Sequence, residues 1–268
     1  MRSQQFLAGP FGDGMVEVAS SPIDYAQLQA IAAKHHDDYA NADPFPHIIL
    51  EGMVDANCLD QILEEFPGNA ELEHWRRNIV HEKKMRMQDG KLGFTKEQFM
   101  SIVTRNLLWE LNSGPFLRIL EQLTGIQNLL PDPSLRGGGL HQIEPGGVLG
   151  VHADFTQHPQ YKLDRRINLL LFLNRDWPDE YGGHLELWAK DLSACVKSIR
   201  PVFGRMVVFN TSTDSFHGHP IPLTCPADRV RRSIALYYYT NGREDGVTKA
   251  TPDTDWKRLP ELPRPPHQ

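Results

Sequence analysis

Short apolar runs separated by turn residues fill the chain after Pro131-Asp132-Pro133, and this pattern restricts the possible folds more than any other feature. Apolar runs of about four to eight residues bounded by Gly, Pro or Asp are typical of strands. A series of such strands predicts an antiparallel double-sheet barrel. We therefore expect a mainly β protein with some α-helix, folded as a double-stranded β-helix of the jelly-roll or cupin-like type. The predicted strands lie at residues 140–143, 148–151, 167–173, 184–188, 206–209 and 234–239.

Helical patterns occupy the part of the chain that precedes these strands. Ser21-Pro22 is typical of an N-cap followed by proline at the first helical position, and Asp55 can cap a second helix. Thr95 with Gln98 resembles a capping box that opens a third helix. Apolar residues recur at helical spacing after each cap, so we expect these N-terminal helices to pack on one sheet of the barrel.

The change from helical to strand period also predicts how the chain is divided. A length of 268 residues suits one large domain. We expect a flexible N-terminal arm over 1–20, one domain over 21–247, and an extended, proline-rich tail over 248–268. Within the domain we expect a helical layer over 21–130 and the β-helix core over 137–240.

Composition excludes several classes of partner. The formal net charge is -6, and Lys and Arg are scattered, so the chain lacks the basic face that binds nucleic acid. The 3 cysteines are widely spaced and include no CxxC pair, which favours unpaired thiols in a reducing compartment. No long apolar stretch predicts a signal peptide or a membrane span. We expect a soluble, cytoplasmic protein that binds no nucleic acid and no membrane, with the N-terminal helices as one surface for oligomer formation.

Three residues are candidates for a metal site. In a strand, residues i and i+2 share a face, so His152 and Asp154 point the same way at the end of a predicted strand. His217 follows the predicted strand at 206–209 and supplies a third ligand from a distant part of the barrel. Two histidines and one carboxylate bind non-haem Fe(II) and leave coordination positions open. On spacing alone, His219 is an alternative to His217.

Two stretches could contact a substrate. The loop after Asp154 offers Phe155, His158 and Tyr161. The charge-rich stretch 71–94 is interpreted as a solvated loop or an edge hairpin, with a mobile cover over the active site as the alternative.

The order H-x-D, several strands, H and then Arg resembles the Fe(II)- and 2-oxoglutarate-dependent oxygenase superfamily, and within it the prolyl-hydroxylase-like branch. Further motifs agree over residues 137–240: Leu173-Asn174 at a strand end, the Gly182-Gly183 turn, Gly204-Arg205 before an apolar strand, and Arg232-Ser233 opening the last strand. Several motifs in the expected order are more specific than H-x-D alone.

The resemblance implies a role for each candidate residue. His152, Asp154 and His217 would bind Fe(II), and Arg232 would bind the distal carboxylate of 2-oxoglutarate, for which a planar guanidinium is suited. The tyrosine that often assists this carboxylate is replaced by Phe172, so Gln142 or Asn168 is expected to supply that hydrogen bond.

One feature leaves the arginine assignment open. The segment between His217 and Arg232 is longer than is common and contains Pro220, Pro222 and Pro226, which makes Arg229 and Arg231 rival candidates. Arg231 and Arg232 should point to opposite faces of the strand.

The resemblance implies a dioxygenase that uses Fe(II), 2-oxoglutarate and O2, with ascorbate as a candidate reductant. Its expected reaction is hydroxylation of an amino acid, a peptide or prolyl residue, or a small metabolite, with release of succinate and CO2. Because Asp154 is present, halogenation is disfavoured. The alternatives are a cupin-like metalloenzyme that does not use 2-oxoglutarate, and a non-catalytic small-molecule-binding module on the same fold.

Overall fold

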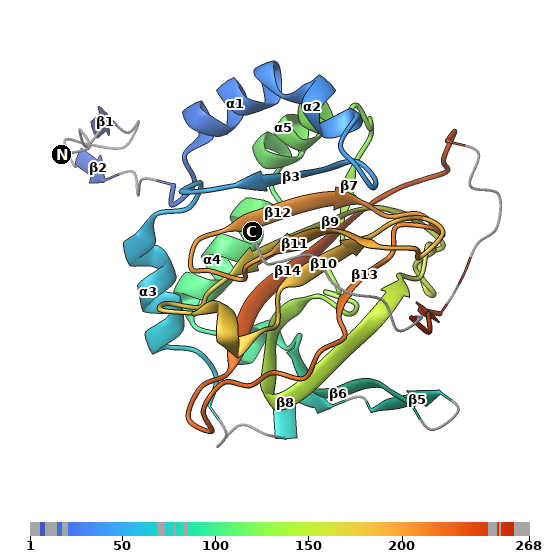
Figure 1. Cartoon of the computed structure of the whole chain (residues 1–268). Coiled ribbons are helices and arrows are strands. Elements are labelled where there is room, and N and C mark those ends of the chain that lie inside the picture. Colours follow the sequence, from blue (N-terminus) through green and yellow to red (C-terminus); the bar gives the residue numbers. More distant parts are fainter. Residues whose placement is uncertain are drawn as a thin grey trace.

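The computed structural model describes residues 6–8, 15–17, 21–68, 73–77, 79–82, 85–245, 251 and 253–259. One curled antiparallel sheet forms its centre, and helices cover one face of that sheet (Figure 1). This is the expected double-stranded β-helix. The strands along the main path of the sheet are, in spatial order, β11 (Cys195–Ile199), β10 (Leu185–Trp188), β13 (His217–His219), β8 (Gly139–Ala153), β14 (Arg231–Thr240), β9 (Asp164–Phe172), β12 (Met206–Asn210) and β3 (His47–Leu50).

The strand β8 links the two halves of the barrel. Its first part pairs with β14 and its last part pairs with β13, so one strand belongs to both halves of the curled sheet. Gly146 and Gly147 lie between the two parts, and a Cβ added to Gly147 would lie 2.6 Å from the Ile143 side chain. The two runs predicted at 140–143 and 148–151 therefore form one bent strand, whose second half carries His152.

The helical layer packs against the outer face of β9, β14 and β12. It consists of α1 (Tyr25–Lys34), α2 (His36–Ala40), α3 (Ala56–Glu64), α4 (Ile102–Leu111) and α5 (Gly114–Thr124). Buried residues of these helices, such as Leu59, Leu108 and Leu120, share one core with Leu169 and Leu236 of the sheet. The expected packing of N-terminal helices on one sheet is therefore present.

The helix starts differ in part from those expected. Asp55 caps α3 by accepting hydrogen bonds from the next turn, as predicted. Asp24 caps α1 in place of Ser21, and Ser101 caps α4 in place of Thr95. In both cases a nearby residue of the same capping type is used.

A second apolar core fills one end of the barrel interior. It contains Phe45, which precedes β3, and Phe172, Leu187, Val207 and Phe209, which come from strands of both halves of the barrel. This apolar core borders the polar side chains where β13 begins, since the ring centroids of Phe209 and His217 are 4.8 Å apart.

The charge-rich stretch forms an edge of the sheet. β6 (Met85–Phe94) pairs with β8, while β4 (Arg76–Arg77) and β5 (Val80–Glu82) pair with β6. The edge-hairpin interpretation is therefore correct for its described part. β7 (Leu130–Pro131) pairs with the C-terminal part of β14, at Tyr238 and Tyr239.

Short segments represent the two ends of the chain. β1 (Phe6–Ala8) and β2 (Met15–Glu17) form a hairpin within the predicted arm. β15 (Asp255–Trp256), in the predicted tail, pairs with the end of β8. The remainder of the arm, and of the tail beyond 259, lies outside the described residues. Within the described part of the chain, no helix has both the length and the apolar character needed to cross a membrane.

Candidate active site

The three candidate metal ligands lie together at the open end of the barrel. His152 and His217 face each other across the β8–β13 pair, and their ring centroids are 4.5 Å apart. Asp154 follows β8, with one oxygen 3.6 Å from His152 Nε2 and the other 3.4 Å from His217 Nε2. One ligand atom from each residue lies within 4.8 Å of the others. Among the described residues, His219 does not join this group, so the spacing ambiguity is resolved geometrically in favour of His217.

Backbone carbonyls orient both imidazoles. Nδ1 of His152 lies 2.8 Å from the Gly150 carbonyl oxygen, and Nδ1 of His217 lies 3.0 Å from that of Ser215. A proton on each Nδ1 donates to these oxygens, so each Nε2 presents its lone pair to the space beside Asp154. Burial, together with the neighbouring His152, lowers the pKa of His217 to about 4. The imidazole is therefore neutral, as a metal ligand must be, at physiological pH.

Two residues hold the carboxylate of Asp154 in place. The sequence did not indicate that either of them lies there. Arg165 Nη2 donates to Asp154 Oδ2 at 2.9 Å, and Asn168 Nδ2 donates to the same oxygen at 2.7 Å. The guanidinium is fully buried and lies over the rings of Phe155, at 4.6 Å, and Tyr237, at 3.4 Å. Although burial raises the pKa of Asp154, Arg165 and the two imidazoles lower it well below its ordinary value. Asp154 is therefore an anion, and its Oδ1 is left to bind a metal.

Asn168 thus has a different role from the one expected. Its carbonyl oxygen accepts from Arg165 and from the Thr211 hydroxyl, and its amide nitrogen donates to Asp154. Asn168 therefore orients the metal-binding carboxylate, and it also lines the inner cavity.

A buried cavity of about 60 Å3 extends from the metal ligands into the barrel. Its polar walls come from several strands. It adjoins an outer groove of about 290 Å3, because both are lined by Lys91, Leu149, His152, Asp154 and Tyr237. The other polar side chains in the inner cavity are His141, Asn168, His217, His219, Arg231 and Ser233.

Arg231, and not Arg232, lines this cavity, so the predicted placement of Arg232 is wrong. Side chains alternate along β14, and the packing of its outer residues Ile234 and Leu236 in the helical-layer core sets the phase. Arg232 shares that outer face, where its guanidinium lies 4.7 Å from the Phe66 ring centroid. Arg229 is excluded as well, because its side chain bonds the carbonyl of Asp176 outside the cavity.

The Gly182-Gly183 turn positions Arg231. Arg231 Nε donates to the Gly183 carbonyl at 2.7 Å, and the guanidinium lies 4.9 Å from the Phe172 ring centroid. Gly183 has φ +70, and a Cβ there would lie 2.8 Å from Arg231 Cδ. Only glycine suits both the backbone conformation and the contact. Burial lowers the pKa of Arg231 to about 9, so the side chain is still cationic at neutral pH.

Gln142 also fails to reach the cavity. It lies directly opposite Arg232 in the β8–β14 register, and opposed residues share a face of the sheet. Its neighbours His141 and Ile143 line the cavity instead. The prediction that Gln142 contacts the co-substrate is therefore wrong, for the same reason of strand phase as Arg232.

The loop after Asp154 contributes one of its three candidates to the groove. Phe155 lines the outer groove. His158 is buried, and its Nδ1 accepts from the backbone N–H groups of Gln160 and Tyr161. Tyr161 stacks on His158 with 4.6 Å between ring centroids, and neither lines the groove. These two residues shape the loop.

Sequence reasoning missed two further residues of the site. Lys91 of β6 lines both the inner cavity and the outer groove. The stretch 71–94 that contains it was considered as a cover over the active site, but Lys91 itself was not a candidate. Burial lowers the pKa of Lys91 to about 8, and the positive charges of Arg165 and Arg231 act in the same direction. Trp256 of β15 lies 4.8 Å from His152 between ring centroids. No local pattern in the proline-rich tail marked it.

Comparisons with known proteins agree with this geometry. Residues 138–239 match the sequence profile of the 2OG-Fe(II) oxygenase superfamily, and this range contains all three candidate metal ligands and Arg231. No curated protein matches the chain.

Solved structures share the fold at low sequence identity. A prolyl hydroxylase from Trichoplax adhaerens, in complex with a hypoxia inducible factor peptide fragment, is 16% identical with a TM-score of 0.55, over 80% of this chain and 90% of that one. A prolyl-4-hydroxylase from Pseudomonas putida is 17% identical with a TM-score of 0.53, over 80% and 100%. A non-heme alpha ketoglutarate dependent carbocyclase from nogalamycin biosynthesis is 15% identical with a TM-score of 0.53, over 90% and 98%.

These relatives catalyse different reactions on one fold, so the likeness does not by itself indicate a substrate. The superfamily match and the His-Asp-His group together assign Fe(II), 2-oxoglutarate and O2 as cofactor and co-substrates. Residues 138–239 therefore form a 2OG-Fe(II) oxygenase domain, which makes the protein a 2-oxoglutarate-dependent dioxygenase, and its fold is that of the prolyl hydroxylases.

Proposed function

We propose that this protein is a hydroxylase that acts on an amino acid, a peptide or prolyl residue, or a small metabolite, with release of succinate and CO2. The observation that carries the proposal is the buried cavity that joins His152, Asp154 and His217 to the cation of Arg231. A 2-oxoacid needs both ends of such a cavity: a metal for its oxo group and near carboxylate, and a cation for its distal carboxylate.

The residues present fit both groups. The two Nε2 lone pairs and Asp154 Oδ1 converge from one side, which leaves the opposite positions of a metal open. At the inner end, no described residue forms a hydrogen bond with either ring nitrogen of His219, although the side chain is buried. Burial lowers the pKa of His219 well below its ordinary value, and Arg231 and Lys91 lower it further, so the ring is neutral. A neutral imidazole beside Arg231 can donate a hydrogen bond to a bound carboxylate.

We assign roles to the chain on this basis. His152, Asp154 and His217 hold Fe(II), and Arg231 binds the distal carboxylate of 2-oxoglutarate in a bidentate manner. Ser233, which faces the same cavity, and His219 take the part that the family gives to the tyrosine replaced by Phe172. Arg165 and Asn168 fix the orientation of Asp154.

With Fe(II), 2-oxoglutarate and O2 bound, the metal supplies the oxidation that places one oxygen atom of O2 in a substrate C–H bond and the other in succinate. The protein orients the co-substrate between Arg231 and the metal ligands. Leu170 and Leu185 line the same cavity and Phe172 lies beside Arg231, so these apolar side chains limit the access of water.

Product analysis tests the proposal. We expect the Fe(II)-loaded protein to convert 2-oxoglutarate to succinate and CO2 slowly without substrate, and faster when a substrate that gains one oxygen atom by mass spectrometry is present. Asp154→Ala should abolish both activities, whereas Arg232→Gln should retain them. Absence of succinate from the wild-type protein with Fe(II), ascorbate and 2-oxoglutarate would contradict the proposal.

A further inference from the structure

The outer groove is the route from solvent to the metal ligands. Its walls come from β6, from the turn before β8, from the loop after Asp154 and from the C-terminal segment around β15. The same groove is lined by His152 and Asp154, so a molecule lying in it reaches the metal ligands directly. We define the groove by the residues Arg76, Gln88, Lys91, Arg136, Asp154, Phe155, Asp253 and Trp256.

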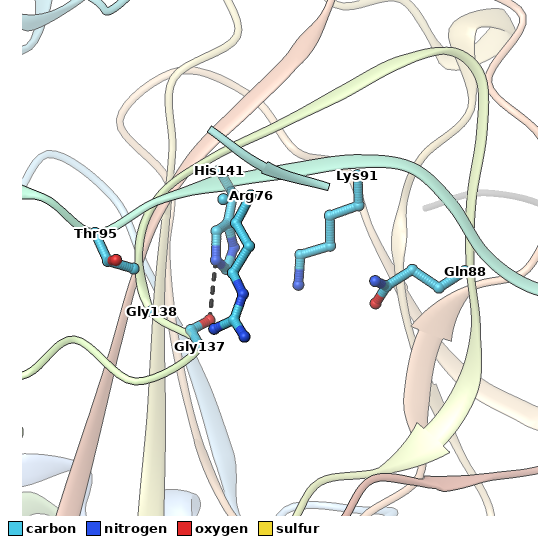
Figure 2. Close-up of a pocket in the computed structure, with 8 residues that line it drawn as sticks. Arg76, Gln88, Lys91, Thr95, Gly137, Gly138 and His141 are labelled. Carbon is cyan, nitrogen blue, oxygen red and sulfur yellow. Dashed lines mark hydrogen bonds between the residues drawn. The ribbon is translucent and has the colours of Figure 1, made fainter. Parts of the chain in front are cut away.

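Three cations face this groove without an acidic partner. Within the described part of the chain, no carboxylate lies within ion-pair distance of Arg76, Lys91 or Arg136. Figure 2 shows Arg76 and Lys91, together with Gln88, directed into the same space above Gly137 and Gly138. Lys91 lies deepest of the three cations, since it also lines the inner cavity.

Neighbouring arginines are paired. Arg77, next to Arg76, has its Nη2 2.7 Å from the Glu144 carboxylate, outside the groove. Arg165 uses the carboxylate of Asp154 at 2.9 Å. The remaining acid on the groove is Asp253, so its lining carries a surplus of positive charge. This local surplus contrasts with the net charge of -6 for the whole chain.

We propose that the substrate of this enzyme is a small molecule that carries a carboxylate or phosphate group, and that Arg76 and Arg136, with Lys91, bind this anionic group in the outer groove. The proposal rests on the proposed function, because it places the reacting carbon of the same molecule beside His152 and Asp154. Arginine is suited to both anions, since its planar guanidinium matches either one with two hydrogen bonds.

The backbone fixes Arg136 at the groove. Two of the residues after it, Gly138 and Gly139, pack where no side chain fits, and a Cβ on Gly138 would lie 2.6 Å from the Ala235 carbonyl oxygen. The Gly137 carbonyl accepts a hydrogen bond from the Tyr237 hydroxyl at 2.8 Å. The turn is therefore anchored to β14, and Arg136, which directly precedes it, lines the same groove as Arg76.

Charge and size disfavour other occupants. An uncharged prolyl segment in the groove would displace water from the exposed Arg76 and Arg136 and from Lys91 without giving these cations a partner, which costs free energy. A groove of about 290 Å3 admits a small molecule, and the negative net charge opposes a polyanion such as nucleic acid.

Anion binding tests the proposal without knowledge of the substrate. Inorganic sulfate, a dianion across the neutral pH range, is titrated calorimetrically into anaerobic protein loaded with Fe(II) and 2-oxoglutarate. We expect sulfate to bind the wild-type protein and the matched control Arg77→Gln with equal affinity. Each of Arg76→Gln and Arg136→Gln should weaken binding by about tenfold, which corresponds to one lost charge-assisted contact. Equal sulfate affinity in the double variant and the wild type, or no binding to the wild type, would overturn the proposal.

A turnover screen identifies the source of the anion. Matched carboxylic acids, their amides and phosphate esters are tested for the gain of one oxygen atom. Oxygenation confined to carboxylates or to phosphates supports the proposal and separates the two; oxygenation confined to amides or neutral prolyl peptides refutes it. Should the proposed function itself fail, no succinate would form, while the loss of sulfate binding in the arginine variants would still be measurable on Fe(II)-loaded protein.

Discussion

Replacing Arg231 with glutamine tests the co-substrate assignment on a residue that the structure distinguishes from its neighbour. Arg231 is buried beside the metal ligands, and Arg232 lies on the opposite face over Phe66. Truncating one partner of a buried charge pair costs about 2 to 5 kcal/mol. Arg231 is already desolvated before ligand arrives, as its pKa of about 9 indicates, so little further desolvation opposes binding. We therefore expect Arg231→Gln to weaken the binding of 2-oxoglutarate by at least about 100-fold, or about 3 kcal/mol.

Anaerobic calorimetry of 2-oxoglutarate binding to Fe(II)-loaded protein measures this difference. Arg232→Gln is the matched control and should keep the wild-type affinity within about threefold, or less than 1 kcal/mol. Thermal unfolding gives a second readout, because a ligand at about 100 times its Kd stabilises the native state by about 2.7 kcal/mol. That stabilisation should disappear in Arg231→Gln at the same concentration. A loss of affinity in Arg232→Gln with normal binding in Arg231→Gln would refute the strand-phase argument.

Three further predictions concern residues around the same cavity. Arg165→Met leaves the buried carboxylate of Asp154 without its partner and should lower the stability of the metal-free protein by about 3 kcal/mol, with a smaller loss once a metal is bound; equal losses by thermal unfolding would contradict this. Lys91, with its pKa lowered to about 8 by burial and by Arg165 and Arg231, is charged below pH 8 and loses its proton as the pH rises. The affinity of the loaded protein for sulfate should therefore fall between pH 7 and pH 9. The Lys91→Met variant should bind sulfate more weakly at every pH, and its affinity should not depend on pH. The Trp256 ring lies 4.8 Å from His152, so binding of Co(II) should quench its fluorescence; an unchanged quench in Trp256→Phe would show that the tail lies elsewhere.

The fold and the metal ligands could be predicted because their signals are local. Apolar runs between turn residues define strands wherever they lie, and His152 and Asp154 are two residues apart in one of them. His217 could be added because it follows a clear strand. Strand β13 itself was not predicted, since His217–His219 has no apolar alternation and is defined only by its partners β8 and β10.

The phase of a strand was the harder problem. Arg231 and Arg232 are equivalent in sequence, and both precede an apolar run that is buried on both faces. Which arginine faces the metal depends on the helical layer, because Ile234 and Leu236 pack against it and turn Arg232 outward. The prediction for Gln142 was wrong for the same reason, because the face of β8 on which it lies also depends on this packing. Pattern alone cannot choose a face when both faces are apolar.

Groups that reach the site from distant segments gave no local signal. Lys91 lies in a charge-rich stretch where solvated side chains are the usual interpretation, and its burial follows from the pairing of β6 with β8. Trp256 is brought to His152 by two paired residues of β15. Arg165 has an ordinary place at the start of a strand, and its contact with Asp154 depends on the loop between them.

The central claim is that His152, Asp154 and His217 hold Fe(II) in a cavity where 2-oxoglutarate chelates the metal and is bound by Arg231. Anaerobic addition of Fe(II) and then 2-oxoglutarate to the metal-free protein, followed by visible spectroscopy, tests it most directly. We predict a charge-transfer band of the chelate that saturates at one equivalent of Fe(II), is absent in His217→Ala and is retained in His219→Ala. A wild-type protein that shows no band at saturating 2-oxoglutarate, or an unchanged band in His217→Ala, would contradict the account.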